Sequence, residues 1–262
     1  MEVMDILVNH FQHFLLVWAR MTAVVFLAPA FSAPVIPDRL RLIFGFMVSL
    51  CVFPWVAKIS VPIPPELGLL FLAVVKEALV GVCIGFFLSI LFAAFSLSTQ
   101  FFTSQIGLGM SQVFDPITQE ETPVLSSLFT TVALLVFISI GGMHMVVRAT
   151  VDSYQLVPVI DFLSQKENLL ELAVRYMGLS FVVALKLAFP VIAASTVIVV
   201  VLGIAGKAAP TLNIMVLGLP LQLGVGLLFL IFAVPPMLTL FGSVFENAVS
   251  DVLQLLIRMR AA

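Results

Sequence analysis

The fold is decided by one long apolar stretch, residues 67–102, which reads LGLLFLAVVKEALVGVCIGFFLSILFAAFSLSTQFF. Its only charged side chains are those of the adjacent Lys76 and Glu77. A membrane-spanning helix needs about 20 mostly apolar residues, and the hydrocarbon core that it crosses is about 30 Å thick. A helix of roughly 35 residues would be about 50 Å long. The stretch therefore predicts a membrane helix that tilts, breaks or extends beyond the bilayer.

The composition of the whole chain leads to the same class. Of its 262 residues, 62% are hydrophobic and only 10% are charged. A soluble domain is about half apolar and about one quarter charged, so this chain lacks the polar residues needed to cover a water-facing surface. The net charge is -2 and the basic residues are scattered, which argues against nucleic acid as a partner. We expect an integral membrane protein.

Further apolar segments give the number of helices. With the stretch above, about six long hydrophobic helices are predicted, so the expected fold class is all-α. Four prolines inside the last two segments predict kinks, and the tail at 243–262 is expected to form an amphipathic helix. The additional segments are 11–31, 40–60, 124–147, 172–205 and 212–242, and the prolines are Pro190, Pro220, Pro235 and Pro236.

The ends of the chain and its basic residues bear on topology. Glu2 and Asp5 stand where a cleaved signal peptide would carry Lys or Arg, so we expect the first apolar segment to stay as an anchor. With six spans, the positive-inside rule favours both termini in the cytoplasm.

Charged side chains within apolar segments normally face a protein interior or a wet cavity, because exposing them to lipid is costly. Two hypotheses follow for them: they form interhelical pairs that fix an assembly, or they relay protons or ions in a transporter. The pairing hypothesis is the more ordinary one. These residues are Arg20, Lys76, Glu77, Arg148, Lys186 and Glu246.

Other chemistry finds little support in the sequence. The chain has no Gly-rich phosphate loop, nucleophile elbow or HExxH pair, so we expect neither an enzyme nor a bound cofactor. The spacing of the histidines and cysteines matches no metal site and no disulfide framework. These residues are His10, His13, His144, Cys51 and Cys83.

The positions of glycine and proline say more about helix packing and helix breaks. Gly81 and Gly85 lie one helical turn apart, which is typical of a face where two membrane helices approach closely. The stretch GIAGKAAPTLNIMVLGLPLQLGVG, residues 203–226, interrupts an apolar run with glycines and prolines. Non-helical backbone at membrane depth must be buried in protein or line a water-filled space. Two interpretations stay open: a broken helix at a small-solute site, or a sharp turn between two long helices.

A second unusual segment is QIGLGMSQVFDPITQEETP, residues 105–123, which separates two very apolar segments. It contains two glycines and two glutamates but no Lys or Arg. Connections of this length are uncommon in compact domains and are often functional. Residue chemistry alone leaves two hypotheses, an ordinary connector and a segment with a role of its own.

These motifs together resemble the FliR family, the export-gate subunits of flagellar type III secretion, which also has homologues in virulence secretion. The resemblance rests on QIGLGMSQVFDP followed by TPVLSSL, on GKAAPTLNIMVLGLPLQLGVG, on PVIPDR followed by LRLIFGFMVSL, and on KEALVGVCIGFFLSILFAAF. It extends over nearly the whole chain in order and spacing. The wording FDPITQEETPVL favours a flagellar system over an injectisome.

The resemblance implies an architecture and partners. FliR-type subunits resemble a fusion of FliP and FliQ, so it implies a FliP-like part at 1–170, a FliQ-like helical hairpin at 171–242 and the amphipathic tail. It also implies a non-enzymatic subunit of the bacterial inner membrane at the flagellar basal body. FliP-like and FliQ-like subunits would assemble with it, with an FlhB-like subunit near the entrance. Together they would enclose a conduit for unfolded flagellar proteins.

In this family the segment after the third long helix acts as a plug, which implies that role for 105–123. Glycines supply a flexible hinge, apolar side chains with an adaptable Met supply a seal, and an Asp-Pro pair sets the turn out of the plug. The absence of Lys and Arg keeps the segment from binding lipid phosphates. The expected plug residues are Ile106, Gly107, Leu108, Gly109, Met110, Val113, Phe114, Asp115 and Pro116.

The remaining candidate residues are expected at interfaces with neighbouring subunits or helices. They are Arg20, Lys76, Glu77, Gly81, Gly85, Lys186, Lys207, Pro210, Asn213, Gly218 and Pro220. The competing hypothesis is a secondary transporter of a small solute, with broken-helix sites at 105–123 and 203–226. A scaffold without channel-lining residues is a third hypothesis.

Overall fold

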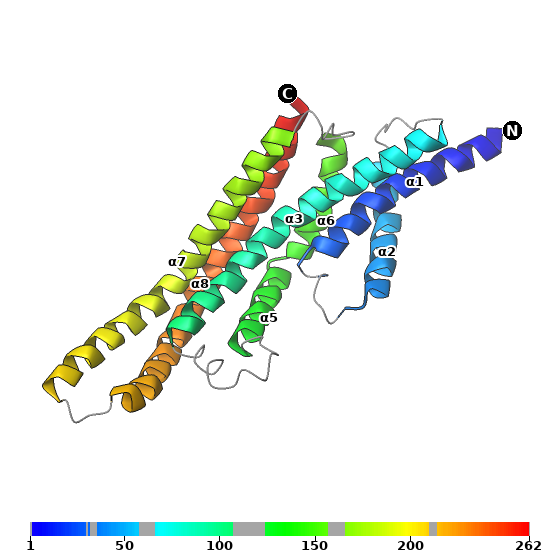
Figure 1. Cartoon of the computed structure of the whole chain (residues 1–262). Helices are drawn as coiled ribbons and strands as arrows, with labels where there is room; N and C mark the ends of the chain where they lie inside the picture. Colours follow the sequence, from blue (N-terminus) through cyan, green and yellow to red (C-terminus); the bar gives the residue numbers. More distant parts are fainter. Residues whose placement is uncertain are drawn as a thin grey trace. The chain divides into compact units, whose positions relative to one another are not determined.

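The computed structural model describes residues 2–29, 31, 36–57, 66–106, 124–156, 166–209 and 214–261, and every regular element within them is an α-helix (Figure 1). In chain order the helices are α1 (Glu2–Leu27), α2 (Asp38–Val56), α3 (Leu67–Gln105), α5 (Val124–Ser139), α6 (Gly142–Leu156), α7 (Lys166–Ala208) and α8 (Ile214–Ala261).

Five of these helices are long and apolar enough to cross a membrane, and α5 with α6 would make a sixth span if the two count as one broken crossing. Their apolar stretches are Leu7–Leu27, Asp38–Val56, Leu67–Gln105, Ala173–Ala208 and Pro220–Phe245. The prediction of an all-α membrane protein with about six long hydrophobic helices is confirmed.

The fourth predicted segment, 124–147, is not one continuous helix in the structure. Helix α5 ends at Ser139 and α6 begins at Gly142. Between them Gly141 has φ of 75°, a left-handed conformation that glycine adopts without steric cost. Its N–H donates to the Ile138 carbonyl at 3.0 Å, which closes the turn at the end of α5. The pair of glycines therefore breaks the segment.

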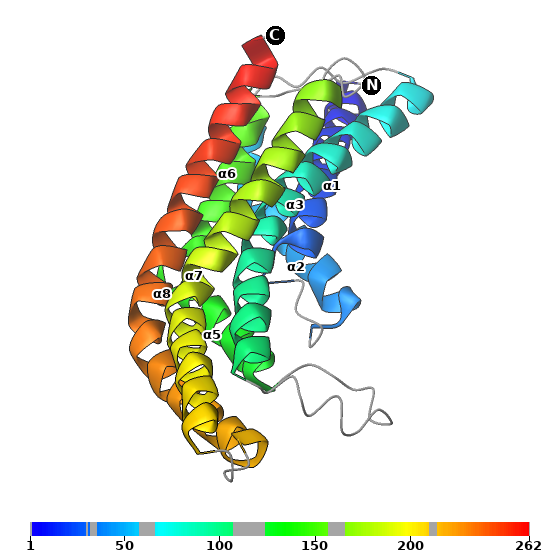
Figure 2. The ribbon, with the colours of Figure 1, turned by 60° about the vertical axis from the view of Figure 1, so that its left-hand side comes forward.

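The prolines of the last two helices lie inside them. Helix α7 continues through Pro190, and α8 continues through Pro220, Pro235 and Pro236 and includes the tail. Because α7 ends at Ala208 and α8 begins at Ile214, the stretch 203–226 holds the end of one long helix and the beginning of another. The two helices run side by side between 177 and 244 (Figure 2).

The chain forms two compact units. The first comprises residues 1–91, 137–176 and 245–262, and the second comprises 92–136 and 177–244. This division by packing leaves the division into a FliP-like part, a FliQ-like hairpin and a tail as a prediction.

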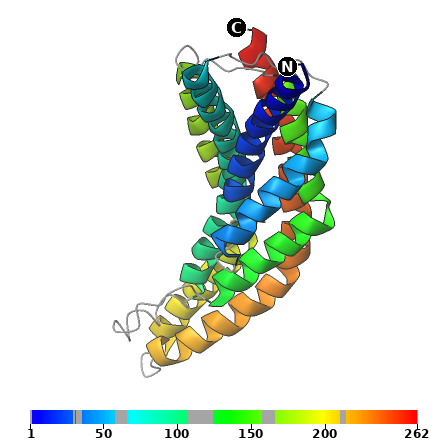
Figure 3. The same cartoon turned by 90° about the vertical axis from the view of Figure 1, so that its right-hand side faces the viewer.

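In the first unit, α1 packs against α2 and α6 (Figure 3). Edge-to-face aromatic contacts join α1 to α2, with ring centroids 5.4 Å apart for Phe14 and Phe46 and 6.1 Å for Trp18 and Phe46. In the same unit, Val17, Met21, Val56 and Tyr154 form a buried cluster. Large aromatic rings in this geometry stabilise a contact beyond the area they bury.

The core of the second unit is a chain of phenylalanines. Phe95 of α3 packs against Phe241 of α8 at 5.0 Å and against Phe129 of α5 at 6.2 Å between ring centroids. Phe102, about two turns further along α3, packs edge-to-face on Phe129 at 5.1 Å. All four rings are buried. Spacings of three, four and seven residues place such side chains on one face of α3, which explains how an evenly apolar helix presents a defined seam.

Candidate functional site

Arg20 is a charged residue of the first unit whose side chain is fully buried. Its Nε donates to Oε2 of Glu77 on α3 at 2.5 Å, and its Nη1 donates to Oγ of Ser153 on α6 at 2.9 Å. Ser153 in turn donates to the Thr150 carbonyl at 2.5 Å. One guanidinium thus links three helices. Its fixed fork of donors suits such a role better than the single ammonium of Lys.

Tyr154, the neighbour of Ser153, completes the cluster. The guanidinium carbon of Arg20 lies 4.0 Å from the centroid of the Tyr154 ring, a cation–π contact. The Tyr154 hydroxyl donates to the Val17 carbonyl at 3.0 Å. Arg20, Glu77, Ser153 and Tyr154 are called the arginine cluster below. Its members satisfy one another away from lipid, as a buried charge in a membrane protein requires.

The close approach of α3 to α1 places Glu77 within reach of Arg20. A Cβ atom on Gly81 would overlap the Arg20 carbonyl oxygen and lie 2.8 Å from the Ala23 Cβ. One turn later, a Cβ on Gly85 would lie 2.5 Å from the Leu27 Cβ. The predicted small-residue face is therefore a contact between two helices of this chain.

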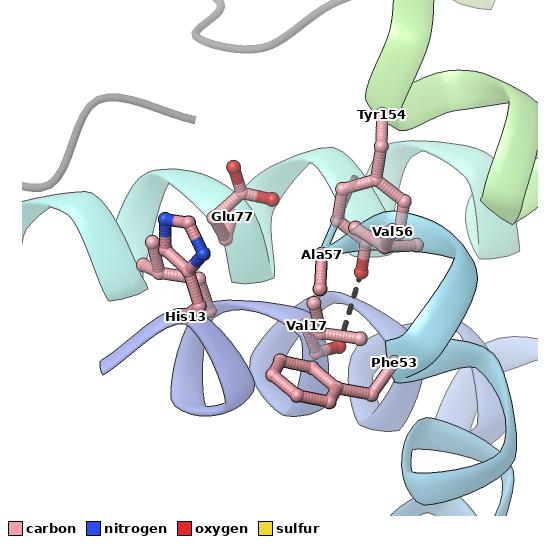
Figure 4. Close-up of a pocket in the computed structure, with 8 residues that line it drawn as sticks. His13, Val17, Phe53, Val56, Ala57, Glu77 and Tyr154 are labelled. Carbon is pink, nitrogen blue, oxygen red and sulfur yellow. Dashed lines mark hydrogen bonds between the residues drawn. The ribbon is translucent and has the colours of Figure 1, made fainter. Parts of the chain in front are cut away.

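A small cavity lies beside the arginine cluster, lined from α1, α2, α3 and α6 (Figure 4). Its volume is about 10 Å³, which is room for about one water molecule. Glu77 and His13 both line it, and Figure 4 also shows the hydrogen bond from Tyr154 to Val17 at its wall. The cavity is too small for a metabolite.

The other predicted interface residues are spread over the structure. Lys76 is half-buried and Gly218 is buried, whereas Lys186, Lys207 and Pro220 are exposed. Pro210 and Asn213 lie outside the described residues. Among the expected plug residues, Ile106 is fully buried, and the ones that lie outside the described residues are Gly107, Leu108, Gly109, Met110, Val113, Phe114, Asp115 and Pro116.

Sequence reasoning missed Ser153 and Tyr154. Their signal is the polar run Asp152-Ser153-Tyr154, which follows the apolar fourth segment. Polar side chains in such a run are candidate hydrogen-bond partners for an arginine on another membrane helix. The sequence does not say that the run and Arg20 meet, because they are 133 residues apart.

In the part of the chain that the structure describes, no group of three or more His, Cys, Asp or Glu side chains could hold a metal ion. Cys51 is exposed and Cys83 is half-buried, and both are free thiols.

Comparison with known proteins identifies the family. The model of the family described as "Bacterial export proteins, family 1" matches residues 11–248. The chain belongs to this family. The predicted resemblance to FliR proteins is confirmed by relatives of nearly the same length. "Flagellar biosynthetic protein FliR" of Bacillus subtilis (strain 168) is 28% identical over 97% of this chain and 98% of its own.

Two more FliR proteins agree with this assignment. That of Pectobacterium carotovorum subsp. carotovorum is 29% identical over 94% of this chain and 95% of its own. That of Escherichia coli (strain K12) is 29% identical over 89% and 90%. The helices and the membership of the bacterial export family together make this chain a multi-pass membrane protein.

Proposed function

We propose that the chain is a subunit of the flagellar type III protein export apparatus in the bacterial inner membrane. It assembles with FliP-like, FliQ-like and FlhB-like subunits and with them encloses the conduit for unfolded flagellar proteins. It acts without catalysis. The observation that carries the proposal is the family match over residues 11–248.

The apolar length of α7 supports an assembly with other proteins. Its apolar stretch Ala173–Ala208 has 36 residues, which makes it about 54 Å long at about 1.5 Å per residue. Lipid covers about 30 Å of that length, and more if the helix is tilted. Phe189 and Ile204 on this stretch are exposed in the isolated chain. Exposed apolar surface beyond the reach of lipid needs cover from other subunits.

Purification from the native host tests the assembly. A tagged chain extracted in mild detergent should bring down FliP-like and FliQ-like proteins together, since its apolar surface is shared with them. The exposed charge of Lys207 lies at the end of α7, so Lys207→Glu should lower the recovery of these partners at least threefold and reduce motility. Recovery of the tagged chain as a stable monomer without partners would contradict the proposal, and would favour the small-solute transporter instead. Unchanged recovery and motility in Lys207→Glu would remove Lys207 from the interface.

We also propose that residues 105–123 close the conduit between export events. Deleting residues 107–112 should then raise the ion and small-solute permeability of cells severalfold while the complex still assembles. Permeability is measured by uptake of an otherwise excluded dye, and assembly by co-purification. If the complex assembles and the membrane stays tight, the segment is a connector and the scaffold hypothesis takes its place.

A further inference from the structure

The C-terminus of α3 lies among the helices of the second unit. The last carbonyl groups of a helix have no partner within that helix. In apolar surroundings a carbonyl without a partner is costly. The Gln105 carbonyl, at the last residue of α3, accepts a hydrogen bond from the side-chain amide of Gln222 on α8. A side chain from another helix thus caps the end of α3.

One turn after Gln222, α8 makes room for the next residue of the chain. Ile106 is fully buried, and its N–H donates to the Phe102 carbonyl at 2.9 Å. A Cβ on Gly226 would overlap the Ile106 side chain and lie 2.9 Å from the Ile106 Cβ. At Gly224, two residues away on the same helix, a Cβ would have nothing within 4 Å. The absence of a side chain at 226 therefore creates the site for Ile106.

Helix α7 also contacts the last turns of α3. The Gln105 side-chain amide lies 3.4 Å from the Thr196 hydroxyl, a long hydrogen bond. Edge-to-face packing of Phe101 on Phe181, with centroids 5.7 Å apart, adds a contact one turn earlier. Gln105 thus contacts both α7 and α8, and Ile106 packs on α8, directly before residue 107.

We infer that Gln222 and Gly226 form an anchor on α8 that holds the end of α3 and sets where the chain enters residues 107–123. Both are positioning residues. Spaced four apart, they present an amide donor and a gap on one face of α8. This inference assigns a structural role to QLGVG, residues 222–226, within the stretch 203–226. Its consequence for sealing rests on the proposed role of 105–123 as a plug.

Disulfide trapping tests the anchor without reference to sealing. The assembled complex is made in the native host with Cys51→Ser and Cys83→Ser, and Ile106→Cys is combined with Gly226→Cys. A disulfide needs Cβ atoms about 3.5–4.5 Å apart, so the two positions must separate by about 1 Å. Mild oxidation should cross-link more than half of the chains. The matched pair Ile106→Cys with Gly224→Cys should give at least fivefold less, and equal yields from the two pairs would overturn the anchor.

Steric rescue tests what the anchor does. Gly226→Ala should raise dye uptake severalfold, because the new methyl group displaces Ile106, while Gly224→Ala should leave it unchanged. Ile106→Gly removes both clashing atoms and leaves its Cα at 3.9 Å from the new methyl, so adding it to Gly226→Ala should bring uptake back to within twofold of the parent. Gln222→Met, which keeps length but cannot donate, should also leak. Immunoblots confirm equal chain levels.

The outcomes separate the two proposals. If deletion of residues 107–112 leaks but Gly226→Ala and Gln222→Met do not, the anchor is wrong and the plug stands. If the deletion does not leak, the plug is wrong, and the cross-linking yields alone decide the anchor.

Discussion

Arg20→Met is expected to be among the most damaging single substitutions in the chain. It leaves the Glu77 carboxylate buried without its cation and removes the contacts of the guanidinium with Ser153 and Tyr154. Breaking a buried pair by removing one partner costs about 3–5 kcal/mol. We expect loss of most of the chain from the membrane fraction and loss of motility. Immunoblotting of membranes and swarming on soft agar measure the two effects.

A matched control separates this effect from loss of positive charge. Arg148 is also in the first unit, but its side chain is 76% exposed and lies 4.0 Å from Asp152. Exposed pairs contribute about 0–1 kcal/mol. Arg148→Met should therefore leave abundance and motility close to those of the parent, and equal damage from both substitutions would contradict the structural role of the arginine cluster.

The double substitution Arg20→Met with Glu77→Met decides between the two hypotheses for the buried charges. Replacing a whole buried pair by apolar side chains is often neutral or stabilising, and Ser153 keeps its bond to the Thr150 carbonyl. Abundance should return, because no charge is left unpaired. If motility returns as well, the pair serves packing. A chain that is abundant but does not support motility would show that the charges act in export itself.

The helices could be predicted because their cause is local. A continuous run of apolar side chains long enough for a membrane predicts a helix, because a helix satisfies its backbone groups within the segment. The strands of a membrane barrel would instead be short and alternate apolar with polar residues. The predicted segment 67–102 and helix α3, Leu67–Gln105, accordingly differ by three residues at one end. The break between α5 and α6 was missed although its signal, Gly141-Gly142, is in the sequence. A Gly-Gly pair normally marks a turn, but glycine is more frequent in membrane helices than in soluble ones, which weakens this signal in an apolar run.

The candidate site was predictable only in part. That Arg20 and Glu77 face a protein interior follows from the cost of exposing charge to lipid. That they pair with each other depends on the approach of α3 to α1, and the two residues are 57 positions apart. Gly81 and Gly85 indicated a close approach but not the partner helix. Gln222 lies in the unusual stretch 203–226. Its acceptor, however, is the Gln105 backbone carbonyl, and no sequence pattern distinguishes one backbone carbonyl from another.

Gly81→Ala is expected to weaken the contact that brings these charges together. Its added methyl group would meet the Arg20 carbonyl oxygen and the Ala23 Cβ, and both belong to rigid parts of α1. Overfilling a packed contact costs about 1–3 kcal/mol. We expect a lower melting temperature of the detergent-purified complex and a lower chain level in membranes. Gly68→Ala on the same helix is the control, since a Cβ there has nothing within 4 Å.

Coupling to Arg20 makes this prediction specific. If the methyl group of Gly81→Ala pushes α3 away from α1, it also draws Glu77 away from the Arg20 guanidinium. Gly81→Ala and Arg20→Met would then damage the same contact. Substitutions in contact are not additive, whereas distant ones add within about 0.3–0.5 kcal/mol. Gly81→Ala should therefore cost clearly less in the Arg20→Met, Glu77→Met chain than in the parent. An equal loss of stability in the two chains would mean that Gly81 serves packing alone and does not position the ion pair.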